Sequence, residues 1–187
     1  MRWESLFEDL ETQLNGELLR DRATEIQEMV RIERSQVGLA DRLRAQYGNV
    51  LALDLAGGLR LRGTLRHVGA GWLSMAEGPA ECVVPFAALR GIEGMDGKAL
   101  PADVAALGPA RRRLGLGAAL RALVRDRTRV ALHGTDGRLL GAGTLDHAGA
   151  DYLQLAVHPR DEYRRPGAVH AVVAVPFAAL AAVRRDT

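Results

Sequence analysis

Hydrophobic and polar positions alternate along two stretches of the chain, and this alternation predicts two sets of β-strands. In residues 50–66, leucines recur at alternate positions on either side of a Gly-Gly turn, with mostly small or polar residues between them. Residues 128–146 repeat the pattern around Asp136-Gly137, a dipeptide typical of a two-residue hairpin loop. Because strand side chains point to alternate faces, each set is expected to direct one face to a core and the other outward.

The second set of strands is a copy of the first. Residues 63–76 return as residues 143–156, and the block Val-Pro-Phe-Ala-Ala-Leu at 84–89 returns unchanged at 175–180. Self-similarity of this kind predicts a duplicated structural unit. The chief difference is an insertion at 157–171, which is either functional or merely tolerated on a compact unit.

Apolar residues at a spacing of three and four predict helices ahead of the strands. One such stripe lies near the start of the chain and consists of Trp3, Leu6, Phe7, Leu10 and Leu14. Asn15-Gly16 is a stop or kink, after which the pattern resumes as a long helix to about Ala45. The stripe needs a partner surface, either the strands of its own chain or the same helix of a second chain.

These patterns divide the chain into four segments. They are an N-terminal helical segment (1–46), a first small β-barrel (47–92), a connector with a helix (93–127) and a second small β-barrel (128–187). The predicted fold class is therefore α+β: two small antiparallel β-barrels, each preceded by a helix, plus the long N-terminal helical segment. Each unit is near the size at which a single core is marginally stable, so the units are expected to pack together or against another chain.

Composition and charge narrow the class of protein. The chain carries 25 Lys and Arg against 23 Asp and Glu, a net charge of +2, and only Lys98 is a lysine. An arginine excess of this kind partly reflects the residue usage of a GC-rich genome. No apolar run reaches the roughly 18 residues that cross a bilayer, and Met1 is not followed by a signal peptide. We expect a cytoplasmic protein with no membrane partner.

The sequence contains little that could support catalysis. Cys82 is the only cysteine, which excludes an intrachain disulfide, and its strand position predicts a small core residue. His67 and His147 occupy equivalent positions, but neither has further ligands at metal-binding spacing in both copies. No phosphate loop, nucleophile elbow or carboxylate pair is present. We predict a protein that is not an enzyme and has no cofactor, no metal and no small-molecule substrate.

The two copies differ on the outward face of their second strand. This face reads Arg60, Arg62, Thr64 and Arg66 in the first copy, and Leu140, Ala142, Thr144 and Asp146 in the second. An apolar outward face predicts burial against a helix or a partner. The arginine face is a candidate phosphate-binding surface; the residues that would extend it are Arg111, Arg112, Arg113, Arg164 and Arg165, with Trp72 as a stacking ring. Alternatively, these arginines are solvated or pair with the acidic N-terminal segment.

A helix followed by about five bent strands, with Gly63 or Gly143 in the long second strand, resembles the Sm-like small barrel and more loosely any SH3-like barrel. The chain as a whole also resembles an uncharacterised family of actinobacterial proteins. The Sm-like resemblance implies barrels that assemble by pairing edge strands, which the two copies can use internally. Gly69 and Gly149 stand where Sm-like RNA binders typically have Asp, so the resemblance does not carry their uridine site.

Two functions follow from these observations. The first is a non-catalytic interaction or assembly protein, whose duplicated barrels and helical segment dock on a protein partner or on a second copy of the chain. The second is an RNA-binding protein, or one that binds another nucleic acid, led by Arg60, Arg62 and Arg66. The sequence does not identify the partner or the oligomeric state.

Overall fold

The computed structural model describes residues 22, 27–29, 31, 35–100, 114–160, 165 and 167–185. The chain divides into two compact units, Met1–Gly38 and Leu39–Thr187. The described strands all belong to the second unit. The predicted N-terminal stripe of Trp3, Leu6, Phe7, Leu10 and Leu14 lies outside the described residues.

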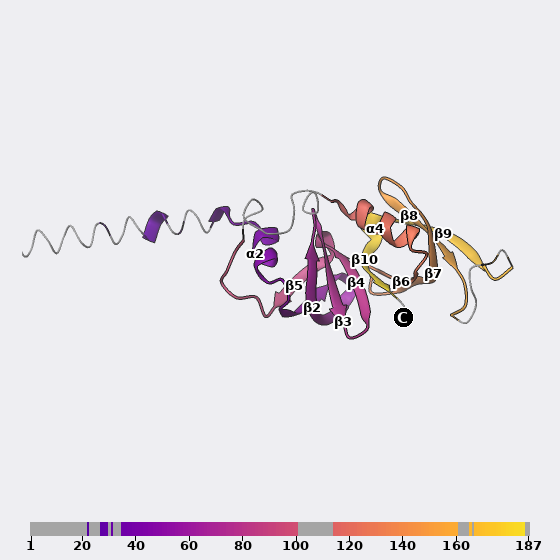
Figure 1. Ribbon diagram of the computed structural model, residues 1–187, viewed down its shortest axis with the longest axis horizontal. Coiled ribbons are helices and arrows are strands. Elements are labelled where there is room, and N and C mark those ends of the chain that lie inside the picture. The colour runs from indigo at the N-terminus through magenta and orange to yellow at the C-terminus, as the bar shows by residue number, and fades with distance from the viewer. Residues whose placement is uncertain are drawn as a thin grey trace, which may run out of the picture. The chain divides into compact units, whose positions relative to one another are not determined.

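The described part of the second unit contains ten strands, some of which are joined by short helical turns (Figure 1). Those of the first half are β1 (Val50–Leu55), β2 (Arg60–Val68), β3 (Trp72–Glu77), β4 (Ala80–Pro85) and β5 (Leu89–Glu93). Those of the second half are β6 (Arg129–Gly134), β7 (Leu139–Ala148), β8 (Tyr152–Val157), β9 (Ala171–Pro176) and β10 (Leu180–Arg185). Short 3₁₀ turns η1 (Ala56–Gly58), η2 (Phe86–Ala88) and η3 (Phe177–Ala179) connect some of them.

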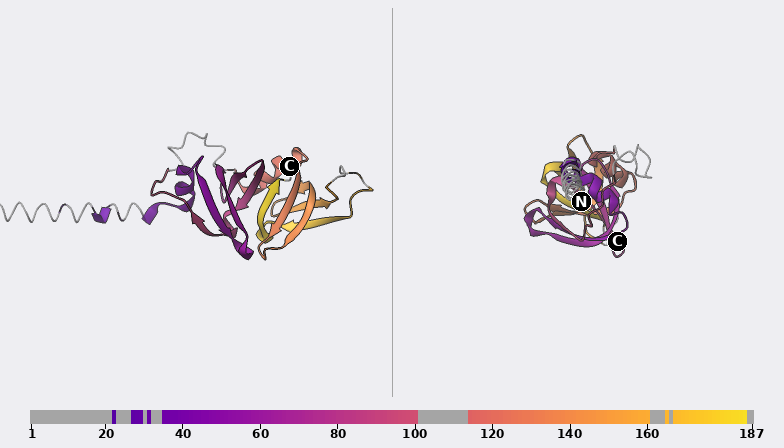
Figure 2. Two further views of the ribbon diagram at one scale, coloured as in Figure 1. Left: turned by 90° about the horizontal axis from the view of Figure 1, so that it is seen from below. Right: turned by 90° about the vertical axis from the view of Figure 1, so that its left-hand side faces the viewer.

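All ten strands form one antiparallel sheet in the order β5-β1-β2-β3-β4-β10-β6-β7-β8-β9. The halves therefore have the same internal order, and they join where β4 pairs with β10. Figure 2 shows the strands of the first half (purple) lying beside those of the second half (orange and yellow). The sheet is open, with β5 and β9 as its end strands. The predicted fold class of two small Sm-like barrels plus a long helical segment is wrong, because paired edges merge the two halves into a single open sheet.

The helices of the described residues are short. α2 (Leu39–Ala45) precedes β1, and α4 (Leu116–Arg125) precedes β6. Val37 and Gly38 are not helical, so the helix predicted to run to about Ala45 is interrupted there. Glycine has one of the lowest helix propensities, which accounts for a break at this point.

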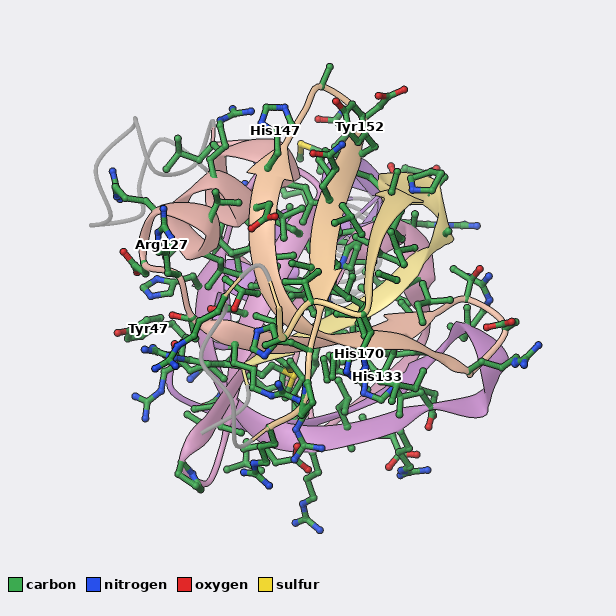
Figure 3. All side chains as sticks on the ribbon, turned by 90° about the vertical axis from the view of Figure 1, so that its right-hand side faces the viewer. Tyr47, Arg127, His133, His147, Tyr152 and His170 are labelled. Atoms are coloured by element: carbon green, nitrogen blue, oxygen red, sulfur yellow. The ribbon has the colours of Figure 1, made fainter. Side chains whose placement is uncertain are left out.

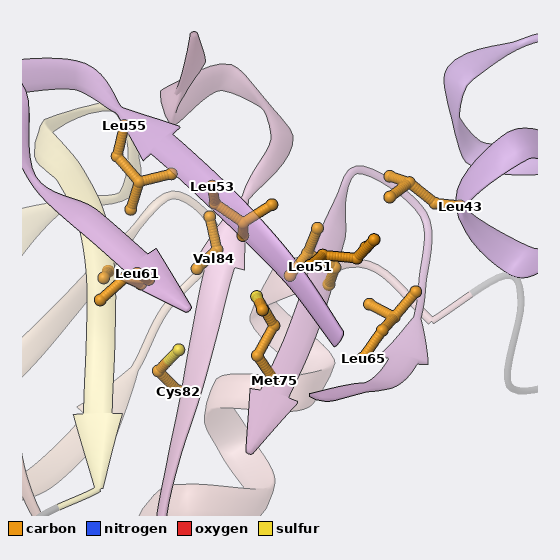
Figure 4. Packing of buried hydrophobic residues seen from close by; sticks show 11 residues of the cluster. Leu43, Leu51, Leu53, Leu55, Leu61, Leu65, Met75, Cys82 and Val84 are labelled. Atoms are coloured by element: carbon orange, nitrogen blue, oxygen red, sulfur yellow. The ribbon is translucent and has the colours of Figure 1, made fainter. Parts of the chain in front are cut away.

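Each half has its own cluster of buried apolar residues. In the first, Leu43 from α2 packs with strand residues that include Leu51, Leu65 and Met75 (Figure 4). In the second, Leu120 from α4 takes the corresponding place, together with Val130 and Leu145. Amphipathic helices thus close one side of each cluster, and apolar burial of this kind is the main stabilising contribution to folding.

Gly63 and Gly143 hold corresponding positions in the second strand of each half. A Cβ atom at Gly63 would collide with the carbonyl oxygen of Ala76, and one at Gly143 with that of Ala156. Only glycine allows the neighbouring strand to approach so closely. The duplicated glycine is therefore a packing requirement of both halves.

Candidate functional site

The first-half arginines predicted as a phosphate-binding stripe lie along β2. Arg60, Arg62 and Arg66 are all exposed. The guanidinium of Arg60, however, lies 2.7 Å from a Glu93 carboxylate oxygen and 3.4 Å from one of Asp54. The leading arginine of the stripe is thus engaged with acidic residues of its own sheet.

The other residues predicted for nucleic-acid binding are not assembled around this stripe. Trp72 is only 9% exposed, and its indole Nε1 donates a hydrogen bond to the Leu114 carbonyl at 2.7 Å, so its ring is not a free stacking surface. Arg165 is exposed; Arg111, Arg112, Arg113 and Arg164 lie outside the described residues. The prediction of Sm-like barrels is wrong, and the RNA binding that it suggested has no support from Arg60 and Trp72, which are engaged within the chain.

The second-half stripe is largely covered. Leu140 packs against the second core cluster, and Ala142 is half-buried. A register shift between Leu132 and His133 sets Leu139, rather than Leu140, opposite the end of β6. Leu139 is consequently the exposed residue, at 58%. The sequence alternation alone could not reveal this bulge.

The insertion at 157–171 contributes to the cover of this stripe. His158 is 6% exposed, and its Nε2 lies 2.9 Å from Thr144 Oγ1. A guanidinium nitrogen of Arg129 donates to the carbonyl oxygens of His158 and Pro159, at 2.8 and 2.9 Å. Buried polar groups need partners of this kind. The start of the insertion is therefore built into the second half.

Residues that could support chemistry are not clustered. In the described ranges, no three His, Cys, Asp or Glu side chains gather as a metal site would need. The ring centroids of His147 and Tyr152 are 5.9 Å apart at the ends of β7 and β8 (Figure 3). Cys82 is buried, as expected, and burial raises the pKa of its thiol to about 11, so it is protonated at neutral pH.

The two halves pair through edge strands, as the resemblance implied, although the sequence does not predict which residues meet. Val83 of β4 lies opposite Val183 of β10, and Cys82 lies opposite Arg184. Two ion pairs accompany this pairing, Arg184 with Glu77 at 2.8 Å and Arg185 with Glu81 at 3.9 Å. A hollow of about 440 Å³ adjoins it and is lined in part by His133 and Leu139. Burial, and then the charge of Arg184, lowers the pKa of His133.

The two end strands are the repeat counterparts of the strands that meet at this junction. The shared Val-Pro-Phe-Ala-Ala-Leu block makes β9 the counterpart of β4, and β5 the counterpart of β10. β9 has the sequence Ala-Val-Val-Ala-Val-Pro, and Val172 in it is 57% exposed. An unpaired edge rich in β-branched residues is a template for pairing with another chain. These edges are the candidate functional site.

Comparison with known proteins adds no further assignment: no family model, curated protein or solved structure matches this chain. Among the helices in the described part of the chain, none has the length and apolar character that crossing a membrane requires.

Proposed function

We propose that this chain is a non-catalytic assembly protein whose copies join head to tail, with β9 of one copy pairing with β5 of the next. One observation carries the proposal: the two open edges are the counterparts of β4 and β10, which already pair inside the chain. A heterologous contact of this kind produces rings if its rotation closes and filaments if it does not.

The internal junction supplies a register for the contact between copies. Since Val84 corresponds to Val175 and Leu89 to Leu180 in the repeated block, the pair Val83 and Val183 translates to Ala174 and Ile92. Ala174 of one copy would therefore face Ile92 of the next. Backbone hydrogen bonds would carry this pairing, as in other cases of strand addition to a sheet edge.

The N–H groups of β9 have the arrangement that strand addition requires. The Phe177 N–H donates to the Asp151 carbonyl, on the side of β8. Because backbone donors alternate in direction along a strand, the N–H groups of Ala174 and Val172 point to the open side. Pro176, which has no N–H, takes up the next such position. Ala174 is thus the best position at which to block the edge.

The contact between copies would differ from the internal junction in charge. Glu81 and Arg185, which pair within the chain, correspond to Val172 and Gly94. The intermolecular contact would therefore lack this ion pair, and its strength should change little with salt.

The test is the mass of the full chain in solution, measured by light scattering over a range of concentrations. The wild-type mass should rise with concentration at low and high salt, whereas Ala174→Pro should stay monomeric because it removes an outward donor without removing a bond to β8. Ala174→Val is the matched control, since it keeps the N–H and should still assemble. A wild-type chain that is monomeric throughout the range would end the proposal.

A mixing experiment tests the head-to-tail direction. Ile92→Pro blocks the β5 edge, with Ile92→Ala as the control for lost packing. Ala174→Pro and Ile92→Pro should each be monomeric alone, yet together form a heterodimer, because each retains the edge that the other lacks. Dimerisation of Ile92→Pro on its own would instead indicate that β9 pairs with β9.

A further inference from the structure

A cavity of about 290 Å³ lies between the outer face of the first half and α4, the helix that belongs to the second half. Its floor includes Trp72 and Ser74 of β3 and Val83 of β4, and its wall includes Ala119 and Ala122 of α4. This volume is close to the lower end of the range for ligand pockets, about 300–1,000 Å³. The cavity is separate from the open edges of the sheet.

Two hydrogen bonds fix the start of the wall. The indole Nε1 of Trp72 donates to the Leu114 carbonyl at 2.7 Å, and the backbone N–H of Ala70 donates to the same oxygen at 3.1 Å. On α4, Leu120 and Leu123 contribute to the core of the second half. The alanines of the helix face the first half, and their small side chains leave space above β3.

Ser74 is the buried polar residue of the cavity lining. The residue is 7% exposed, and its hydroxyl has no hydrogen-bond partner among the described residues. A buried hydroxyl without a partner is destabilising, because it has given up its hydrogen bonds to water. Because Ser74 lines an apolar cavity, a ligand that supplies one donor or acceptor at this point recovers that cost. His67 and Glu81 also line the cavity and are the more exposed of its polar residues.

We propose that this cavity binds a small, uncharged and largely apolar molecule that carries a single hydroxyl or carbonyl group. The apolar body lies between Trp72 and the α4 alanines, and the polar group forms a hydrogen bond with Ser74 Oγ. Pockets with this composition use a few polar groups to orient a ligand and apolar area to hold it. This inference does not depend on self-assembly of the chain.

The experiment titrates the full chain with 4-propylphenol and with propylbenzene, which differ by one hydroxyl. Binding is followed by ligand-observed NMR and by Trp72 fluorescence in a Trp3→Phe background. The phenol should bind saturably and more tightly than the hydrocarbon. Ser74→Ala should weaken the phenol about two- to tenfold, the worth of one neutral hydrogen bond, and should leave propylbenzene unchanged.

A second variant locates the site. Ala119→Phe fills the cavity and should abolish binding of both probes, whereas Ala178→Phe, a control at an exposed alanine outside the cavity, should have no effect. Absence of saturable binding to the wild type would overturn the proposal, and so would equal weakening of both probes by Ser74→Ala. Ser74→Ala removes only one oxygen atom, so the test remains decisive even if Ala119→Phe does not fold.

Discussion

The two halves of this chain share a strand order but differ in what covers corresponding surfaces. In the first half, β4 is paired with β10, and α4 lies over Trp72 and Ser74. In the second, none of the described strands pairs with the outer side of β9, and Tyr152, the counterpart of Trp72, is half-buried beside His147. The same unit is thus completed by its neighbour in one case and left incomplete in the other.

The two halves differ at the edges of the sheet more than in their hydrophobic cores. Both halves retain a leucine-rich cluster, the close-packed glycine and the Pro-Phe turn. Among the described residues, no strand pairs with the outer side of β9. One edge of the repeated unit already pairs with a neighbouring copy, where β4 meets β10. The corresponding end strands, β9 and β5, can pair in the same way with further copies of the chain.

The largest expected effect is on stability, when proline is placed at the same position of the paired strand β4 and of the end strand β9. Val83→Pro removes a donor on the side of β10 and leaves a partner carbonyl there without its bond, so we expect a loss of about 2–4 kcal/mol in the free energy of unfolding. Ala174→Pro, at the corresponding position of β9, should change it by less than about 0.5 kcal/mol. Urea titration of the full chain measures both under conditions in which the proteins are monomeric.

Equal losses of stability in these two variants would contradict the comparison. Such a result would mean either that β9 is covered in solution or that the pairing of β4 with β10 contributes little. Val83→Ala is the control for the lost side chain, because it retains the N–H and should cost less than the proline.

The sequence predicted the strands and allowed edge pairing between the two copies, but it did not predict which strands pair or that the sheet stays open. Leucines at alternate positions identified β1 and β2, and the repeated blocks identified their counterparts in the second half. The pairing of β4 with β10 was different, because backbone groups carry it and the side chains of Val83 and Val183 do not distinguish it from other strand pairs. The joined sheet, and with it the failure of the two-barrel prediction, could not be read from alternation.

The candidate sites show the same limit. The repeated Val-Pro-Phe-Ala-Ala-Leu block already contained the correspondence between β9 and β4, and this signal could have identified the open edge. The cavity beside Ser74 depends on the place of α4 over the other half, which no local pattern encodes. The burial of His158 against Thr144 is likewise a tertiary contact between an insertion and a strand. Arg60 and Trp72 were predicted to bind nucleic acid because of their residue types. In the structure Arg60 forms an ion pair with Glu93, and Trp72 donates a hydrogen bond to the Leu114 carbonyl.

A medium effect tests whether the halves unfold together. Gly63→Ala and Gly143→Ala each place a methyl group against a carbonyl oxygen of the adjacent strand, and each should cost about 1–3 kcal/mol, as overpacking does. Because one sheet contains both halves, either substitution should lower the same single unfolding transition. Gly97→Ala is the control, since a Cβ there meets no atom within 4 Å. Two separate transitions in calorimetry, only one of them shifted, would show that the halves fold independently.

The smallest expected effect concerns one pair of corresponding positions in the first strand of each half. Asp54 of β1 lies opposite Arg60 and Gly91, whereas His133 of β6 lies opposite Leu139 and Ala182. Burial, then the charge of Arg184, holds the pKa of His133 below its usual value of about 6.5. The unfolded chain therefore binds this proton more readily than the folded chain, so the contribution of His133 to stability is complete above about pH 6.5 and is lost as the pH falls through its folded pKa.

A His133→Gln variant isolates this contribution, since glutamine retains hydrogen-bonding capacity but does not titrate. The free energy of unfolding of the wild type should fall relative to that of the variant as the pH is lowered from 7.5 to 5.5, and the two should run parallel above about pH 7. A wild type that instead lost stability relative to the variant as the pH rose would contradict this sign, and would mean that the folded protein stabilises the charged imidazole of His133.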